Sequence, residues 1–235
     1  MNKLKAFRII WHQNNFFFYL LASILTIGAI PFFLFDKLAF FILLKQWHHP
    51  VADVIAPYLT WLGDGFTYLL LLTVVALLRA SCRKLIIMGG SFLFMSIVVQ
   101  LFKRIFFRDM LRPIALLPLD ASLHLVDRVS LLRDLSFPSG HAATIFVLIS
   151  VIQLLSKNKN IIYSIAWLGL ALMVAYSRIY LCQHFYIDIY VGAWMGSLSS
   201  LIVYLFVVGF NGPNWLDRSI YSFLYTYAKR FSINK

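Results

Sequence analysis

The sequence predicts an all-α, polytopic membrane protein: a six-transmembrane-helix bundle that forms a single domain over residues 1–235, with both termini cytoplasmic. Three features support this prediction. Of the 235 residues, 61% are hydrophobic and only 13% are charged, with a mean hydropathy of +0.82. Six apolar runs follow one another, and basic residues are divided unevenly among the polar segments between them. A soluble protein of this composition would need helices with polar faces, which these runs lack.

The six runs have different lengths and interruptions. About 20 residues cross the hydrocarbon of a bilayer, and the first, fifth and sixth runs meet this length easily. The second run is interrupted at its start by Gly63, Asp64 and Gly65, where we expect Asp64 to form a turn. The fourth run is short, which suits a helix that begins in a polar pocket. The runs cover residues 16–35, 61–78, 85–102, 142–155, 161–181 and 186–210.

The charges of the polar segments predict the orientation. One set of alternate segments holds twelve Lys and Arg residues with one Asp, and the other set holds nine with eight Asp. By the positive-inside rule the first set is cytoplasmic. Segments 36–60, 103–141 and 178–188 then face outward, which in a bacterial inner membrane is the periplasmic side. The net charge of +12 is scattered in short patches, so we expect no nucleic-acid partner.

Three polar clusters gather at the outward ends of the predicted helices. Ionisable residues at membrane depth are costly, so each cluster is a candidate functional site. The first cluster is the segment 103–113, which is rich in Lys and Arg. The other two are Pro138-Ser139-Gly140-His141 and the set Ser177, Arg178, His184 and Asp188.

The second cluster has the composition of a helix start that binds an anion. Pro138 suits the beginning of a helix, and Ser139 is a favoured N-cap. Gly140 would let a ligand approach the free N–H groups of the first turn, where the positive end of the helix dipole favours phosphate. His141 would then stand beside the anion as a proton donor. Capping alone accounts for this cluster equally well.

The third cluster strengthens the catalytic interpretation. If a helix begins near His184, Asp188 lies four residues later on the same face. The carboxylate can hold the proton on one ring nitrogen and leave the other as a nucleophile. Arg178 can offer a forked pair of donors to phosphate oxygens. No carboxylate cluster of the kind that binds a metal accompanies these residues, so we expect no metal and no cofactor.

These residues resemble the type 2 phosphatidic acid phosphatase family. Its signature reads K-x6-R-P, then P-S-G-H, then S-R-x5-H-x3-D, and the second and third parts match residue for residue. The first part departs, because Lys103 stands nine positions before Arg112 where the pattern needs seven. We favour Lys103 and Arg112 as phosphate-binding residues and hold Arg108 as the substitute. Arg104 is expected to cap its helix or to contact headgroups.

The resemblance implies a lipid phosphatase that forms a phosphohistidine. It assigns attack on phosphorus to His184, orientation of its ring to Asp188, and proton transfer to His141. Family members act on phosphatidic acid, phosphatidylglycerol phosphate, undecaprenyl pyrophosphate and lipid A phosphates, and some transfer the phosphate to a lipid hydroxyl. The expected partners are therefore a lipid phosphate and membrane lipids, with no obligate protein partner. The implied phosphate-binding residues are Lys103, Arg112, Ser139, Gly140 and Arg178.

Other interpretations of the sequence remain open. A non-catalytic lipid-binding protein could keep the shape of the site, and the altered first motif leaves that possibility. A transporter would need polar residues along its spans, whereas these charges gather at one end. Segment 114–136 is either a structural connector or a surface helix that covers the site, because Leu123, Val126, Val129 and Leu132 recur at helical spacing.

Overall fold

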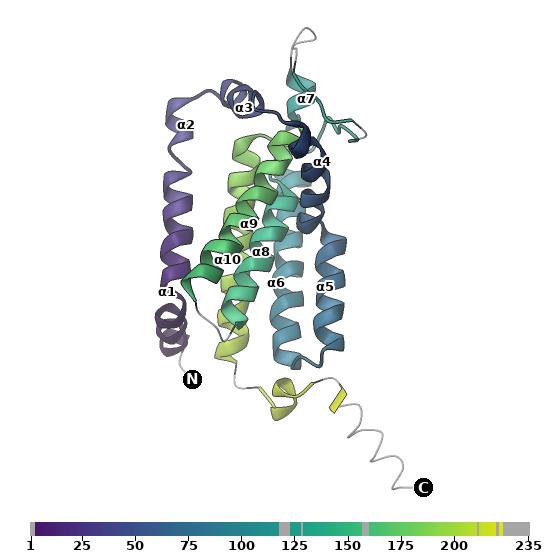
Figure 1. Cartoon of the computed structure of the whole chain (residues 1–235). Coiled ribbons are helices and arrows are strands. Elements are labelled where there is room, and N and C mark those ends of the chain that lie inside the picture. The colour runs from purple at the N-terminus through teal and green to yellow at the C-terminus, as the bar shows by residue number, and fades with distance from the viewer. Residues whose placement is uncertain are drawn as a thin grey trace, which may run out of the picture.

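Helices form the regular secondary structure of the chain. The computed structural model describes residues 3–117, 123–127, 129–156, 160–210, 212–219 and 221–222. Within these ranges the only strand-like feature is one antiparallel bridge between Ser81 and Ser219, so the predicted all-α class is confirmed. The elements in chain order (Figure 1) are α1 (Lys3–Ile27), α2 (Pro31–Leu34), α3 (Lys37–Lys45), α4 (Pro50–Leu59), η1 (Thr60–Gly63), α5 (Gly65–Leu77), α6 (Cys82–Leu101), η2 (Phe102–Phe106), α7 (Pro113–Leu116), α8 (Gly140–Leu155), α9 (Ile161–Tyr180), α10 (Tyr186–Gly209) and η3 (Asn214–Asp217).

Four helical stretches in the described part of the chain are long and apolar enough to cross a membrane. They are Asn14–Leu34, Cys82–Phe106, Ile161–Tyr180 and Tyr186–Gly209. A fifth candidate is the pair Pro50–Gly63 and Gly65–Leu77, which meet at a bend of 59°. α8 is apolar but has only 16 residues. Each predicted span therefore overlaps an apolar helix, while the count of six spans and the cytoplasmic side of the termini stay predictions.

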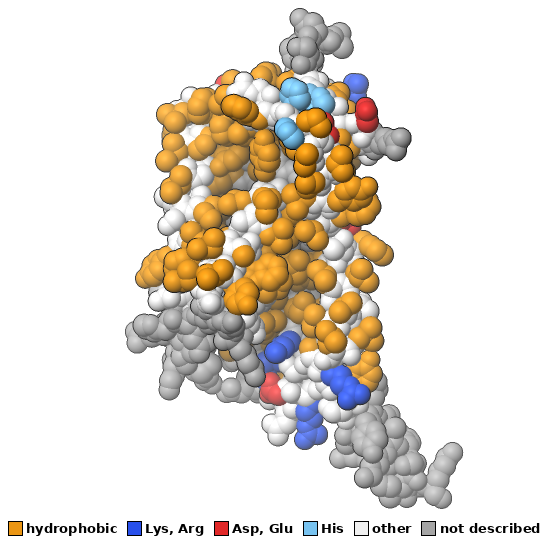
Figure 2. All heavy atoms as spheres, viewed as in Figure 1, with side chains coloured by type: hydrophobic (Ala, Val, Ile, Leu, Met, Phe, Trp, Pro, Cys, Tyr) orange, Lys and Arg blue, Asp and Glu red, His pale blue; other side chains and the backbone are white. Residues whose placement is uncertain are grey.

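The helices run alternately up and down, so that four helix ends meet at one end of the bundle. α6 and α9 finish there, and α8 and α10 begin there (Figure 1). At the opposite end, Arg83 near the start of α6 pairs with Asp217, with Nε 2.7 Å from Oδ1. Between the two ends the flank of the molecule is covered by hydrophobic side chains (Figure 2). This distribution is the one that a surrounding bilayer requires.

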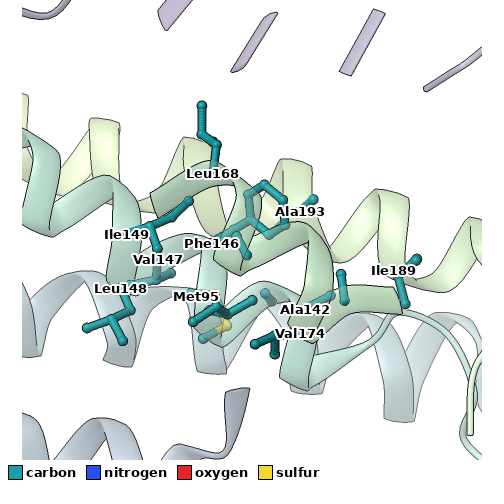
Figure 3. Close-up of a cluster of buried hydrophobic side chains, with 14 of the residues drawn as sticks. Met95, Ala142, Phe146, Val147, Leu148, Ile149, Leu168, Val174, Ile189 and Ala193 are labelled. Carbon is teal, nitrogen blue, oxygen red and sulfur yellow. The ribbon is translucent and has the colours of Figure 1, made fainter. Parts of the chain in front are cut away.

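α8 forms the centre of the bundle. Twelve of its sixteen residues are buried, and Phe146 lies among side chains of α6, α9 and α10, including Met95, Leu168 and Ala193 (Figure 3). The contact with α10 is especially close, because a Cβ atom added to Gly192 would lie 2.6 Å from the carbonyl oxygen of Ser139. Glycine therefore allows the N-terminal turns of α8 and α10 to lie against each other.

The surface helix considered for segment 114–136 is wrong for the described residues. α7 ends at Leu116, and residues 123–127 and 129–136 are not helical. Long-range hydrogen bonds hold this backbone instead: Arg112 N–H donates to the carbonyl of Arg133 (2.8 Å), and Gln183 Nε2 donates to the carbonyl of Ser130 (2.9 Å). Three of the four apolar residues at helical spacing, Leu123, Val126 and Val129, pack onto the bundle without forming a helix, whereas the fourth, Leu132, is exposed.

Candidate active site

His184 lies in the short turn between α9 and α10 and is almost completely buried. Its Nδ1 atom is 3.4 Å from Oδ2 of Asp188, which stands in the first turn of α10. The same oxygen accepts hydrogen bonds from the Ser136 hydroxyl and from the backbone N–H of Phe185, the latter at 2.9 Å. A carboxylate only accepts, so this arrangement favours the tautomer with the proton on Nδ1 and a lone pair on Nε2.

Burial also sets the protonation state of this histidine. It lowers the pKa of His184 to about 3, although the hydrogen bond and charge of Asp188 act in the opposite direction. A desolvated imidazole is uncharged when its cationic form has no water to stabilise it. The His184 ring is therefore neutral at pH 7, which is the form that can attack an electrophile.

The first turn of α8 faces open space. Ser139 is its N-cap, and the Ser139 hydroxyl oxygen accepts a hydrogen bond from the N–H of Ala142 (3.4 Å). The backbone N–H of Ser139 donates to the carbonyl of Asp188 (2.9 Å), which ties the start of α8 to the start of α10. A Cβ atom added to Gly140 would meet no other atom within 4 Å. An anion can therefore reach the unpaired N–H groups that begin a helix.

Two buried arginines stand beside this helix start. Arg178 lies in the last turn of α9, and its Nη1 donates to the hydroxyl of Thr60 (2.8 Å). Its Nε is buried and has no hydrogen-bond partner within the described ranges, so a phosphate oxygen could satisfy it. Arg112 donates from Nε to the carbonyl of Asp134 (2.9 Å) and from Nη1 to Oε1 of Gln183 (2.8 Å). Both guanidinium groups are thus held rigidly, which suits forked recognition of phosphate.

A π-helical turn accommodates part of the unusual spacing in the first motif. In η2 the N–H of Phe107 donates to the carbonyl of Phe102 at 2.9 Å, five residues back. Such a turn holds one residue more than an α-turn. Lys103 lies in this turn within electrostatic range of the buried charges of Arg112, Arg178 and Asp188.

The neighbouring basic residues of that motif point elsewhere. Arg104 is exposed and donates from Nε to Oε1 of Gln100 (3.1 Å). Arg108 is exposed. The structure therefore places Lys103 and Arg112, the favoured pair, among the charges of the site and leaves Arg108 exposed at the surface.

His141 occupies the first turn of α8, in the same cluster of charges. Its Nε2 is 3.8 Å from Oδ2 of Asp64. Asp64 forms the expected turn, because its Oδ1 accepts a hydrogen bond from the N–H of Phe66 (2.7 Å) and caps α5. His124 pairs with Asp53 of α4, with Nε2 2.9 Å from both carboxylate oxygens.

Sequence reasoning missed four residues of the site or assigned them another role. Gln183 directly precedes His184 and Ser136 stands two residues before Pro138, so closeness to a motif was a usable signal. Thr60 and Asp64 lie far along the chain from the residues they contact; 118 positions separate Thr60 from Arg178. Nothing in the local sequence around Thr60 indicates that contact.

Comparisons with known proteins identify the family. Residues 84–211, more than half of the chain, match the PAP2 superfamily, and this range contains all three polar clusters. The chain belongs to the PAP2 superfamily. The crystal structure of Aquifex aeolicus LpxE is similar to it, with 28% sequence identity and a TM-score of 0.61, and the match covers 72% of this chain and 95% of that chain. No curated protein sequence matches the chain.

The family and the structural match support a phosphatase that acts on lipids, and the apolar helices indicate a membrane protein. In the described part of the chain, no group of three or more His, Cys, Asp or Glu side chains is arranged to hold a metal ion. The side chains that converge at the site instead supply one neutral imidazole, a second histidine and three cationic groups. This set can bind a phosphate and attack it.

Proposed function

We propose that the protein is an integral-membrane lipid phosphatase that hydrolyses a phosphomonoester or diphosphate on a lipid through a phosphohistidine intermediate, without a metal. The observation that carries the proposal is the buried, neutral His184, oriented by Asp188 and surrounded by Lys103, Arg112 and Arg178. Cationic groups draw a phosphate to the site, and an uncharged imidazole is left with the lone pair needed for attack.

In the first step, Nε2 of His184 attacks phosphorus. The new N–P bond forms as the P–O bond to the leaving group breaks, and His141 gives its proton to the leaving oxygen. In the second step His141 takes a proton from water, the resulting hydroxide attacks phosphorus, and the N–P bond breaks to release phosphate and free His184. Lys103, Arg178 and the first turn of α8 neutralise the charge on the equatorial oxygens in both steps.

The position of the site at the ends of the apolar helices favours a lipid substrate. A phosphate held there lies near the depth of lipid headgroups, so an attached acyl chain can stay in the bilayer. The charge distribution of the polar segments supports an outward orientation of this end, toward the periplasmic face of a bacterial inner membrane. Candidate substrates are phosphatidic acid, phosphatidylglycerol phosphate, undecaprenyl pyrophosphate and lipid A phosphates.

The test is phosphate release by the purified protein in detergent with EDTA, measured on these four lipids. His184→Ala should abolish release, whereas His48→Ala, which removes an exposed histidine stacked on His124 at 4.5 Å, should not. Acid-labile, base-stable phosphate on the wild-type protein would identify the phosphohistidine. Release by a well-folded His184→Ala variant, or loss of release in EDTA that added metal restores, would refute this mechanism.

The same panel distinguishes hydrolysis from transfer. A phosphotransferase would release little phosphate from a single lipid and would form a new phospholipid when a lipid alcohol is added. If no product formed with any donor or acceptor, the protein would be a lipid-binding protein without turnover.

A further inference from the structure

Asp64 is a carboxylate at the bend of a candidate membrane span. It follows η1 at the bend between the two halves of the fifth candidate span. α4 is stacked above α5 in Figure 1, and the bend between them brings Asp64 beside the first turn of α8, with Oδ2 3.8 Å from Nε2 of His141. The Asp64 side chain is 46% exposed. An ionised group at such a position is costly and calls for a functional reason.

Capping of α5 does not by itself account for an aspartate. Only Oδ1 is used as the cap, through the N–H of Phe66. Asn or Ser would cap the helix as well without a charge. The second oxygen, Oδ2, is directed to His141, 3.8 Å from its Nε2. The second oxygen therefore needs an explanation of its own.

The backbone around Asp64 is fitted closely to the first turn of α8. A Cβ atom on Gly63 would lie 2.7 Å from the carbonyl oxygen of His141 and 3.1 Å from its Cβ. Thr60, one turn earlier, accepts the hydrogen bond from Arg178. The negative charge of Asp64 also acts favourably on the Arg178 guanidinium. Residues 60–64 therefore form a wall of the active site that contacts both His141 and Arg178.

Asp64 faces a histidine that is otherwise surrounded by cationic or neutral groups. Burial is the largest effect against a proton on His141, and the charged or titratable groups that add to it, from α9, the turn before α10, the loop after η2 and η2 itself, are Arg178, His184, Arg112 and Lys103. Positive neighbours disfavour a protonated imidazole, and a nearby carboxylate favours it. A general acid must carry its proton when the leaving group departs.

We propose that Asp64 is a positioning residue for His141. The negative charge of its Oδ2, 3.8 Å away, favours a proton on Nε2, and Nδ1 of His141 then exchanges the proton of the reaction. This inference rests on the proposed phosphatase reaction. As the N–P bond to His184 forms and the P–O bond breaks, the Nδ1 proton passes to the leaving oxygen, while Asp64 stays ionised and keeps the Nε2 proton in place. Nδ1 later takes a proton from the attacking water, which restores the starting state.

The test removes the negative charge of Asp64 and keeps a side chain that can cap α5. Asp64→Asn should lower kcat on the preferred lipid by about tenfold or more and move the alkaline limb of its pH profile to lower pH, because His141 loses its proton more readily. The pre-steady-state burst from p-nitrophenyl phosphate should be unchanged, because p-nitrophenolate leaves without a proton. Asp64→Glu should restore part of the rate. Asp36→Asn is the matched control, since Asp36 caps α3 in the same way (Leu38 N–H, 2.8 Å).

The outcomes separate the two proposals. A wild-type pH profile in Asp64→Asn, or an equal loss on the lipid and in the p-nitrophenolate burst, would overturn the role of Asp64 while the phosphatase stands. Asp64→Ser also removes the charge and keeps a cap. If only the variant with the lower unfolding temperature lost activity, the loss would follow stability rather than charge, and the role of Asp64 would likewise be overturned. A wild-type protein inactive on every substrate would refute the phosphatase itself.

Discussion

The contact between α8 and α10 predicts a large effect of a single methyl group. In Gly192→Ala the new Cβ atom would lie 2.6 Å from the carbonyl oxygen of Ser139, where ordinary contact begins at 3.4 Å. The obstacle is backbone, so the first turn of α8 must move away from α10 by about 0.8 Å. Displacements on the order of 1 Å among reacting groups cost on the order of 100-fold in rate. Overpacking of this kind also costs about 1–3 kcal/mol of stability.

The assay is phosphate release and thermal unfolding of Gly192→Ala in detergent, beside Gly169→Ala. Gly169 lies within α9, where an added Cβ atom meets no other atom within 4 Å. Alanine there should leave activity unchanged and raise stability by up to about 1 kcal/mol. If Gly192→Ala were as active and as stable as the wild type, the close approach of the two helices could not be what positions Ser139 against Asp188.

Two further predictions concern the surroundings of His184. Burial lowers its pKa from 6.5 to about 3, so the folded protein excludes a proton that the unfolded chain binds. The folded protein is therefore most stable above pH 6.5 and loses stability as the pH falls toward 3. His184→Gln removes the titrating group, so its unfolding temperature should fall less steeply with falling pH. Equal slopes in the two proteins would contradict this. Ser136→Ala removes the hydroxyl donor to Asp188 and should lower kcat about tenfold with KM unchanged, as measured by phosphate release. An unchanged kcat would mean that Phe185 N–H alone holds the carboxylate.

The sequence predicts the helices well because their signals are local. Apolar length marks the spans, Ser139 marks the start of α8, and the glycines around Asp64 mark a break. The irregular segment after α7 could not be predicted in this way. Its apolar spacing resembles one face of a helix, but its backbone hydrogen bonds go to Arg112 and Gln183, and those partners are fixed only when the bundle has formed.

The candidate site likewise has some contacts that follow from local sequence and others that depend on the assembled bundle. His184 stands just before α10 and Asp188 lies in its first turn, four residues later, so their contact follows from spacing. Thr60 and Asp64 meet Arg178 and His141 because the bend between α4 and α5 lies beside α8; the glycines mark that bend, but no short-range pattern reveals which residues it contacts. At the first motif, the count of residues between Lys103 and Arg112 does not reveal the π-helical turn that accommodates part of the extra length.

The wide turn at the end of α6 has a consequence for how this family can vary. A π-helical turn takes up one extra residue, so a residue can be inserted there without moving the side chains that precede it in the helix. The distance between Lys103 and Arg112 along the chain is therefore a looser constraint than their distance in space. Relatives with a longer first motif can keep their phosphate-binding lysine in place, provided that their last apolar turn can open in the same manner.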